Sequence, residues 1–197
     1  MIATWIQLWV ERLALDPSAW TATHTLQLLL GKDAPQRVGR ADLWELRAET
    51  KDPEASVADR FETWMRGSNL FVHPSRDRGV VLGGIAPLPG PATALVAVAD
   101  RGGGESRAHA ITLAHALGGT WRARRGTVWT LAWPPEREAD VPELAERAAW
   151  TRRRTSGLLV NQESQDAVVL VGRWECPVLP GTEGVLGMEA GGHGGMA

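Results

Sequence analysis

Cysteine is nearly absent from this chain, and aromatic residues other than tryptophan are rare. The 197 residues include one cysteine, Cys176, no tyrosine and two phenylalanines. A single cysteine excludes an internal disulfide and a cysteine-based metal cluster, and it is typical of a reducing compartment. The sequence also lacks a long apolar run and a secretory leader pattern. We therefore expect a cytoplasmic protein with no membrane segment.

Neither sign of charge dominates the composition. The formal net charge is −2, and 44% of the residues are hydrophobic. This balance excludes an intrinsically disordered chain and argues against a strongly basic nucleic-acid-binding protein. The length allows one medium domain or two small ones that support each other.

Tryptophan is abundant, with ten residues. One interpretation is a stacking surface for sugars or nucleobases. The other is core packing, because Trp5 and Trp9 fall in a strand-like segment while Trp44 and Trp129 occupy matching positions of an internal repeat. Aromatic side chains at such positions usually pack between a sheet and its helices, and we favour this interpretation.

One sequence pattern occurs twice in the chain. The two copies match, in the same order, at an Ala-Thr opening, a helix ending in Leu-Gly, a segment with a central tryptophan and a long closing segment. The matched pairs are 3–12 with 92–101, 30–31 with 117–118, 43–46 with 128–131, and 68–82 with 156–170. Duplication of a unit predicts a pseudo-symmetric fold in which each copy buries a surface of the other.

Both copies have the same predicted order of elements, β-α-β-α-β. The first copy is expected to form strands at 3–12, near 41–48 and from Leu70, with helices that begin after Asp16 and Asp52. After the strand from Leu70, a turn at 74–78 is expected, and the apolar run at 80–82 is then either a continuation or a hairpin arm. The second copy is expected to form strands near 93–99, near 127–133 and from Leu158, with helices near 106–117 and 141–152. The predicted fold class is α+β, with two tandem units, each an antiparallel sheet with two helices packed on it, paired as a pseudo-dimer.

Domain boundaries follow from this reading. The first repeat is expected at 1–84, a Pro/Gly-rich linker at 85–91, the second and more diverged repeat at 92–172, and a C-terminal tail at 173–197. The glycine-rich end of the tail has little that could enter a core, and we expect it to be disordered.

No group of residues in the sequence predicts a catalytic centre. His24, His109 and His115 fall within predicted helices, without a partner motif, and are expected at helix surfaces or edges. Glycines at 102–104 follow a strand, as in a phosphate-binding loop. They lack the spacing of a P-loop or a dinucleotide fingerprint, so a flexible turn is the favoured interpretation.

Arginines make the second copy locally basic. They are Arg122, Arg124, Arg125 and the run at 152–154. Such residues can bind RNA or a phosphorylated ligand, and they can equally be solvated ends of strands and helices. No aromatic RNA-binding signature accompanies them.

Three segments of the first copy occur in an order that is similar to a known family. Leu-Asp-Pro at 15–17 precedes a helix ending in Leu-Gly, Gln-Arg-Val-Gly-Arg at 36–40 leads into Leu-Trp-Glu-Leu at 43–46, and Leu-Phe-Val-His-Pro at 70–74 is followed by Asp77. They resemble the Leu-Asp-Pro helix start, the Arg-Val-Gly-Lys strand and the Leu-Leu-Ala-Asn-Pro element of the PurS family, the small subunit of the formylglycinamidine ribonucleotide amidotransferase of purine biosynthesis.

The second copy resembles the family less closely. It keeps Arg124-Arg125-Gly126 before a tryptophan strand and has Asn161 in the third motif, whereas 102–105 replace the Leu-Asp-Pro start and Gln162 replaces the proline. Members of the PurS family are similar to one another in working as dimers. The resemblance therefore implies that the tandem chain is a covalent pseudo-dimer.

The resemblance also implies a function. The chain would be a non-catalytic subunit that assembles a glutaminase subunit with an ATP-dependent synthetase subunit and supports ammonia transfer between them. ATP and magnesium are expected in the partner synthetase, and no cofactor is expected in this chain. A homodimer of the tandem chain is a further expected partnership, and nucleic acid is disfavoured. Two alternatives stay open: a duplicated α/β protein-binding module, such as an adaptor or inhibitor, and a nucleic-acid-binding protein without a purine role.

The partner-binding residues that the resemblance implies lie in its three segments. They are Asp16, Arg37, Gly39, Arg40, His73, Pro74 and Asp77. The polar members would act as rim charges and hydrogen-bonding groups. A purely structural interpretation weighs equally, in which Arg37 and Asp77 close turns, Asp16 caps a helix and Gly39 permits a strand bend. No catalytic or metal-binding residue is predicted.

Overall fold

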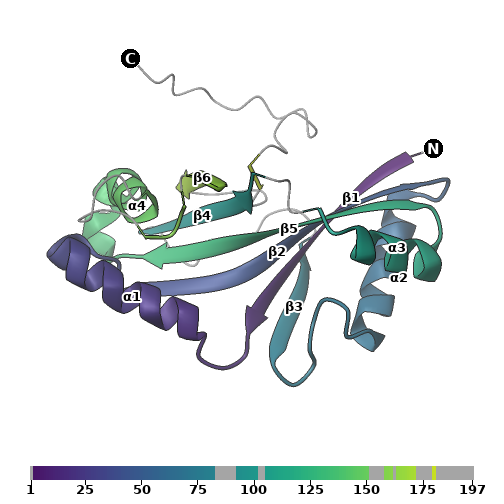
Figure 1. Cartoon of the computed structure of the whole chain (residues 1–197), viewed down its shortest axis with the longest axis horizontal. Coiled ribbons are helices and arrows are strands. Elements are labelled where there is room, and N and C mark those ends of the chain that lie inside the picture. Colours follow the sequence, from purple (N-terminus) through teal and green to yellow (C-terminus); the bar gives the residue numbers. More distant parts are fainter. Residues whose placement is uncertain are drawn as a thin grey trace, which may run out of the picture.

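The computed structural model describes residues 2–82, 92–101, 105–150, 158–161, 163–171 and 179–180. Within these residues, six strands form one antiparallel sheet and four α-helices pack on it (Figure 1). The predicted α+β class is therefore confirmed.

The strands lie in the order β3-β1-β2-β5-β4-β6 across the sheet. Their bounds are β1 Ile2–Arg12, β2 Arg37–Thr50, β3 Asp77–Leu82, β4 Thr93–Asp100, β5 Thr120–Ala132 and β6 Gln165–Val171. The helices are α1 Pro17–Leu30, α2 Glu54–Gly67, α3 Arg107–Leu117 and α4 Val141–Ala149, with short 3₁₀ helices η1 Gly31–Asp33 and η2 Pro135–Asp140. The order is palindromic, because β1 lies between β3 and β2 just as β4 lies between β6 and β5. Strands β2 and β5 join the two halves at the centre of the sheet.

Local sequence explains where α1 begins and ends. The Asp16 carboxylate accepts hydrogen bonds from the backbone N–H groups of Ser18 at 2.7 Å and Ala19 at 3.3 Å. Pro17 occupies the first turn, where a missing N–H costs nothing. Gly31 ends the helix with a φ of 56°, a conformation that favours glycine. The predicted helix between Asp16 and Gly31 is confirmed.

Alternation along the strands divides the sheet into two faces. On the face that we call the helical face, Leu8 of β1 and Leu46 of β2 are buried beneath helices. On the opposite face, Leu43 of β2, Leu95 of β4 and Val128 of β5 belong to a separate apolar cluster. Both faces of the central strands are therefore covered, which explains why these strands are rich in buried apolar residues.

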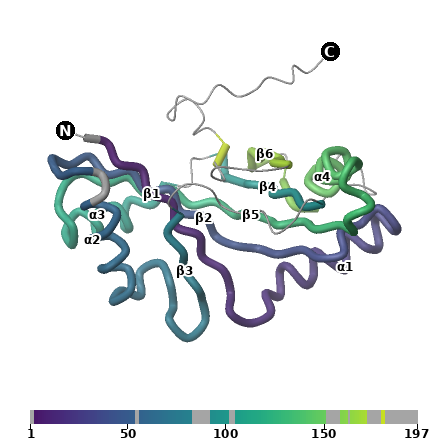
Figure 2. Tube along the Cα trace, turned by 180° about the vertical axis from the view of Figure 1, so that it is seen from behind, coloured from purple at the N-terminus to yellow at the C-terminus, as the bar shows by residue number. Residues whose placement is uncertain are grey.

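The helices pair across the two halves of the chain. Helix α1 packs near α4 at one end of the sheet, and α2 near α3 at the other (Figures 1 and 2). Leu26 of α1 and Leu144 of α4 share a core cluster with Val96 of β4, while Phe61 of α2 and Leu113 of α3 share another. Each helix also packs on a strand of its own half: α1 on β2, α2 on β1, α3 on β5 and α4 on β4. Each of the two clusters therefore combines apolar residues from both halves of the chain.

Two turns with the same hydrogen bonds precede the edge strands β3 and β6. In the first turn, the Asp77 N–H donates to the His73 carbonyl at 2.8 Å, and the Leu13 N–H donates to the Arg76 carbonyl at 2.9 Å. In the second turn, the Gln165 N–H donates to the Asn161 carbonyl at 2.8 Å, and the Arg101 N–H donates to the Ser164 carbonyl at 2.9 Å. In register, Arg12 lies opposite Asp77, and Asp100 lies opposite Gln165. Arg12 therefore corresponds in the structure to Asp100. The sequence match aligns Arg12 with Arg101, which is one residue further along the chain.

These turns also shift the predicted edge strands. Strands were expected from Leu70 and from Leu158, but β3 begins at Asp77 and β6 at Gln165. The backbone between these points is occupied by the turn hydrogen bonds rather than by the sheet ladder. The apolar residue Phe71 is instead buried in the cluster beneath α2 and α3.

A short C-terminal segment packs on the opposite face of the sheet. Leu179 is fully buried there, and its backbone N–H donates to the carboxylate of Glu45 at 2.8 Å. Arg124 donates to the carbonyl of Pro180. Gly126 lies directly beneath Leu179, because a Cβ at this position would overlap the Leu179 side chain. The segment thus contributes to the core of the sheet.

Several expectations concern residues outside the described part of the chain. They are the linker at 85–91, the glycines at 102–104, the arginines at 152–154, Cys176 and the glycine-rich end of the tail. No helix within the described ranges is long and apolar enough to cross a membrane.

Candidate functional site

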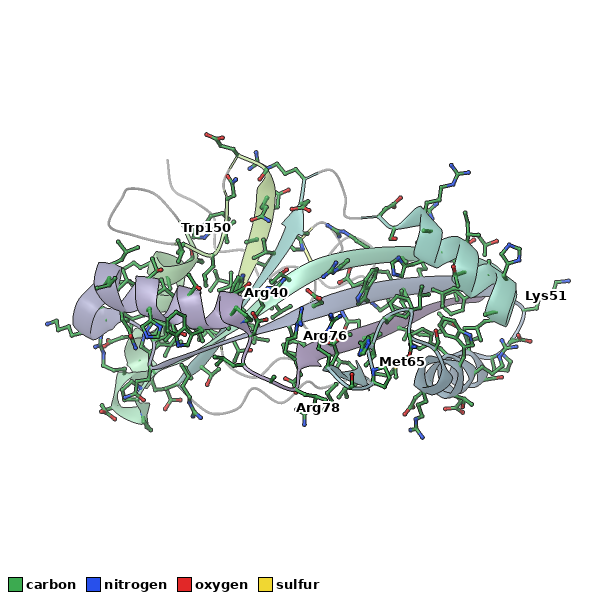
Figure 3. The ribbon with its side chains drawn as sticks, turned by 60° about the horizontal axis from the view of Figure 1, so that its bottom comes forward. Arg40, Lys51, Met65, Arg76, Arg78 and Trp150 are labelled. Carbon is green, nitrogen blue, oxygen red and sulfur yellow. The ribbon has the colours of Figure 1, made fainter. Side chains whose placement is uncertain are left out.

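A polar cleft of about 250 Å³ opens on the helical face, near the middle of the sheet. We call it the arginine cleft, because its lining includes four arginines alongside three aspartates. The charged lining residues are Arg12, Arg40, Arg76, Arg125, Asp16, Asp42 and Asp77. Figure 3 shows Arg40 and Arg76 in this central region, between α1 on one side and α2 and α3 on the other.

One wall of the cleft is formed where α1 begins beside β2. The carboxylate of Asp16 that caps α1 also lies 3.4 Å from a guanidinium nitrogen of Arg40, measured from Oδ2 to Nη1. The cap fixes the carboxylate, and the carboxylate in turn orients the arginine. Asp16 therefore has both of the roles that the sequence suggested as alternatives: it caps a helix and it lines a charged site.

The floor of the cleft is a charged chain along the junction between β2 and β5. Asp42 lies 3.4 Å from Arg40 and 2.7 Å from Arg125, each distance joining a carboxylate oxygen to a guanidinium nitrogen. The Arg40 guanidinium carbon is 5.8 Å from the Trp129 ring centre, and that of Arg125 is 5.6 Å from the Trp44 ring centre. Each arginine is thus held between a carboxylate and an aromatic ring.

The turn before β3 forms the third side of the cleft. One carboxylate oxygen of Asp77 accepts a hydrogen bond from the His73 backbone N–H at 3.2 Å and closes the turn. Asp77 Oδ1 lies 3.8 Å from Arg12 Nε and 3.4 Å from Arg76 Nε. The turn-closing role of Asp77 and its place in the cleft are therefore compatible.

An aromatic wall completes the lining. The ring of His109, on α3, lies 4.4 Å from the Trp44 ring and 5.1 Å from the Phe71 ring, measured between centres. Its Nδ1 is 2.5 Å from the hydroxyl of Ser106. Burial lowers the pKa of His109, a hydrogen bond with the Leu70 backbone opposes this, and the charge of Arg125 lowers the pKa further. The lowered pKa favours the neutral form of His109, and the ring contacts with Trp44 and Phe71 make it part of the aromatic wall.

A second cleft lies across the β2–β5 junction and shares Arg40 and Arg125 with the first. Its other lining residues correspond to those of the arginine cleft by their positions in the sheet. They are Val98 in place of Val10, Asp100 in place of Arg12, Gly126 in place of Ala41, Thr127 in place of Asp42 and Gln165 in place of Asp77. Gln165 Nε2 donates to Asp100 Oδ1 at 3.1 Å. The two clefts have the same framework and different charges.

Three of the seven residues suggested by the sequence come together in the arginine cleft: Asp16, Arg40 and Asp77. His73 and Pro74 lie on the exposed turn next to it. Arg37 is exposed at the start of β2. Gly39 follows two residues later, and a Cβ there would meet only Thr130, at 3.5 Å.

Sequence reasoning missed five polar members of the site: Arg12, Asp42, Arg76, His109 and Arg125. The period of two along β2 was a usable signal, because it places Arg40 and Asp42 on one face. The contribution of Arg125 was obscured because it was grouped with Arg124. Adjacent strand residues face opposite ways, so Arg125 reaches the cleft while Arg124 reaches Pro180 on the opposite face.

The cleft has the chemistry of a recognition site. Among the described residues, no group of histidine, cysteine and carboxylate side chains could hold a metal ion. Guanidinium groups that line a cavity and are positioned by carboxylates are suited to binding anionic groups or acidic surfaces. Comparison with known proteins gives no relative: no family model, no curated protein and no solved structure matches this chain.

Proposed function

We propose that this chain is a non-catalytic subunit that assembles a glutaminase with an ATP-dependent synthetase for formylglycinamidine ribonucleotide formation, as its resemblance to the PurS family implies. Glutamine hydrolysis and ATP-dependent amide activation would take place on the partners, with ATP and magnesium held by the synthetase. This chain would supply the docking surface and support passage of ammonia. Such a protein would act in the cytoplasm.

The observation that carries the proposal is the meeting of three distant motifs at one site. Asp16, Arg40 and Asp77 come from the three segments that resemble the PurS family, and all three line the arginine cleft. These residues are far apart in the sequence but adjacent in the fold, so a single partner could contact all three. Asp16 and Asp77 are each 10% exposed, so they would act by orienting the arginines that a partner meets. Interface charges of this kind add specificity and speed of association more than affinity.

The arrangement of the sheet supports the proposed pseudo-dimer of two β-α-β-α-β units. The strand order is palindromic, and the turns before β3 and β6 have the same hydrogen bonds. Asp42 and Thr127 lie opposite each other in register, flanked by Arg40 opposite Trp129 and Trp44 opposite Arg125. A local two-fold axis through the first of these pairs would exchange the other two. Fusion of two units would make their association intramolecular.

The docking surface that we propose extends from the cleft onto its exposed rim. His73 and Pro74 lie on the exposed turn, and Arg37 is exposed at the start of β2. The corresponding turn of the second half has Asn161 in place of His73. Since these turns have the same backbone hydrogen bonds, the second one provides a matched control within the same chain.

The test is co-expression with the candidate synthetase and glutaminase of the host, followed by measurement of amide transfer. Omitting this chain should abolish glutamine-dependent turnover while ammonia-dependent turnover is retained. His73→Ala should weaken co-purification with the partners, and Asn161→Ala should leave it unchanged. Turnover that is indifferent to this chain, with no co-purification, would refute the assembly role and leave the hypothesis of a duplicated binding module.

A further inference from the structure

We infer that the arginine cleft binds the phosphoryl group of a small phosphate ester, and that each chain has one such site. This inference goes beyond the proposed assembly role and does not depend on it. It rests on the exposure of the arginines, the geometry of their ion pairs, the size of the cleft and the contrast with the second cleft.

The three most exposed charged groups in this cleft are arginines, while Arg40 and Asp42 are exposed to a similar extent, 24% and 22%. The side chains of Arg12, Arg76 and Arg125 are 43%, 57% and 51% exposed, whereas those of Asp16 and Asp77 are each 10% exposed. A ligand entering the cleft therefore meets guanidinium groups first. The aspartates act on those groups from behind, as carboxylates do when they orient an arginine toward an anion.

Most of the ion pairs are too long to occupy the arginines fully. Arg12, Arg40 and Arg76 approach their carboxylates at 3.4 Å or more. Charge-assisted hydrogen bonds between such groups are usually about 2.7–2.9 Å. Each guanidinium also has several N–H donors beyond those used here. These side chains can therefore turn toward a ligand without losing a strong bond.

The number of arginines favours a phosphoryl group over a carboxylate. A carboxylate is planar, and one guanidinium fork can satisfy it. A phosphoryl group is tetrahedral and can accept hydrogen bonds from more than one guanidinium. The cleft offers Arg12, Arg40 and Arg125 from three neighbouring strands and Arg76 from the turn before β3. A volume of about 250 Å³ lies just below the range of roughly 300–1,000 Å³ that drug-sized ligands occupy. The ligand would accordingly be small, such as a sugar phosphate.

The second cleft has the same framework but a different set of charged residues, and it serves as a comparison for phosphate binding. It shares Arg40 and Arg125, and neutral Thr127 and Gln165 stand where the first cleft has aspartates. However, Asp100 stands where the first cleft has Arg12, and Ser164 occupies the turn position of Arg76. An exposed carboxylate at the position of Asp100 would repel a phosphoryl group. We therefore expect one phosphate per chain rather than two.

Isothermal titration calorimetry on the full chain tests this inference, with ribose 5-phosphate, inorganic phosphate, ribose and succinate as probes. We expect ribose 5-phosphate and inorganic phosphate to compete for one site, ribose not to bind, and succinate to bind more weakly. Arg12→Gln should lower the affinity for ribose 5-phosphate roughly 10- to 100-fold. Arg76→Gln should also lower the affinity for ribose 5-phosphate. With two variants, the test remains valid if one of them folds poorly.

Arg78→Gln is the matched control. Arg78 is an exposed arginine of β3 that pairs with Glu11, and Figure 3 shows it away from Arg40 at the edge of the sheet. Its replacement should leave affinity unchanged. Absence of phosphate binding at millimolar concentration, or an equal loss in Arg78→Gln and Arg12→Gln, would overturn the inference. Because no partner protein is present in this experiment, its result is independent of the assembly assay.

Discussion

The guanidinium carbon of Arg125 lies 5.6 Å from the ring centre of Trp44, the residue opposite it in register across the β2–β5 junction. Arg40 and Trp129 form the reciprocal pair at 5.8 Å. Each contact of this kind contributes about 0.5–1 kcal/mol at a partly exposed site. The two pairs connect the halves of the chain and at the same time fix two arginines of the candidate site.

Trp44 should be a major contributor to stability. It is buried between the cleft and the cluster beneath α2 and α3. Trp44→Ala should lower the free energy of unfolding by about 3–5 kcal/mol, because it leaves a large cavity. Trp20 is half exposed on α1, and Trp20→Ala should cost much less. Denaturant unfolding followed by circular dichroism measures both; equal losses would contradict the core role of Trp44.

Gly126 should be required for the C-terminal segment to pack on the sheet. A Cβ at this position would lie 2.6 Å from the Val98 carbonyl oxygen and would overlap the Leu179 side chain. Gly126→Ala should therefore lower the free energy of unfolding by about 1–3 kcal/mol. Gly39→Ala is the control, because its Cβ would meet only Thr130 at 3.5 Å.

The same substitution also tests the contact with Leu179 itself. In the double variant with Leu179→Ala, the cost of Gly126→Ala should be smaller than in the wild-type background, because part of the overlap is gone. Strict additivity in denaturant unfolding would show that the two residues are not coupled.

His109 should make stability depend on pH. Burial and the nearby Arg125 lower its pKa in the folded chain below the ordinary value of 6.5. The unfolded chain then binds the proton more tightly. The free energy of unfolding should therefore be highest above pH 6.5 and should fall as the pH drops from 6.5 toward the folded pKa.

Paired variants on α3 separate this effect from other titrations. His109→Gln should flatten the pH dependence of unfolding in this window. His115→Gln, at an exposed position of the same helix, should leave it as in the wild type. Identical pH profiles for the two variants would argue against a lowered pKa of His109 in the folded chain.

Asp33 should connect the two halves electrostatically. Its carboxylate lies 3.1 Å from Arg137 of η2 and 3.0 Å from Arg147 of α4, and these bonds lower its pKa below the ordinary 3.8. A lowered carboxyl pKa stabilises the fold above pH 3.8, and this contribution is lost as the pH falls through the folded pKa. Asp33→Asn should lower the melting temperature by a few degrees at neutral pH and have no effect in strong acid.

Asp52→Asn is the comparison for Asp33. Asp52 pairs with Arg60 at 2.7 Å within the first half, at an exposed position. Such a single surface pair contributes little, so the melting temperature should change less than in Asp33→Asn. A shift in Asp33→Asn no larger than that in Asp52→Asn would show that the bonds of Asp33 between the halves contribute no more than a single surface pair.

Much of the secondary structure could be predicted from local signals. The Asp16 cap and Gly31 gave the limits of α1, and alternation gave the central strands. The starts of β3 and β6 could not be predicted, because the backbone N–H of Leu70 donates to the Ser68 hydroxyl and that of Leu158 to the Ala148 carbonyl of α4, and neither residue joins the sheet. Apolar character alone does not separate a strand from a buried turn.

The candidate site was only partly visible in the sequence. Motif order identified Asp16, Arg40 and Asp77, which meet in the arginine cleft. Arg12 and Arg125 join them through sheet register, which depends on pairing between residues far apart in the chain. His109 joins them because α3 packs beside α2 of the other half. Neither relationship has a local sequence signal.

The sequence by itself determined the composition of the core, the ends of α1 and the order of strands and helices, because capping and periodicity depend on near neighbours. Only the tertiary structure decided that α1 packs with α4 and α2 with α3, and that Leu179 covers Gly126. Those choices depend on burial between distant segments, which no local pattern encodes. They also place four arginines around one cleft and leave its counterpart with Asp100.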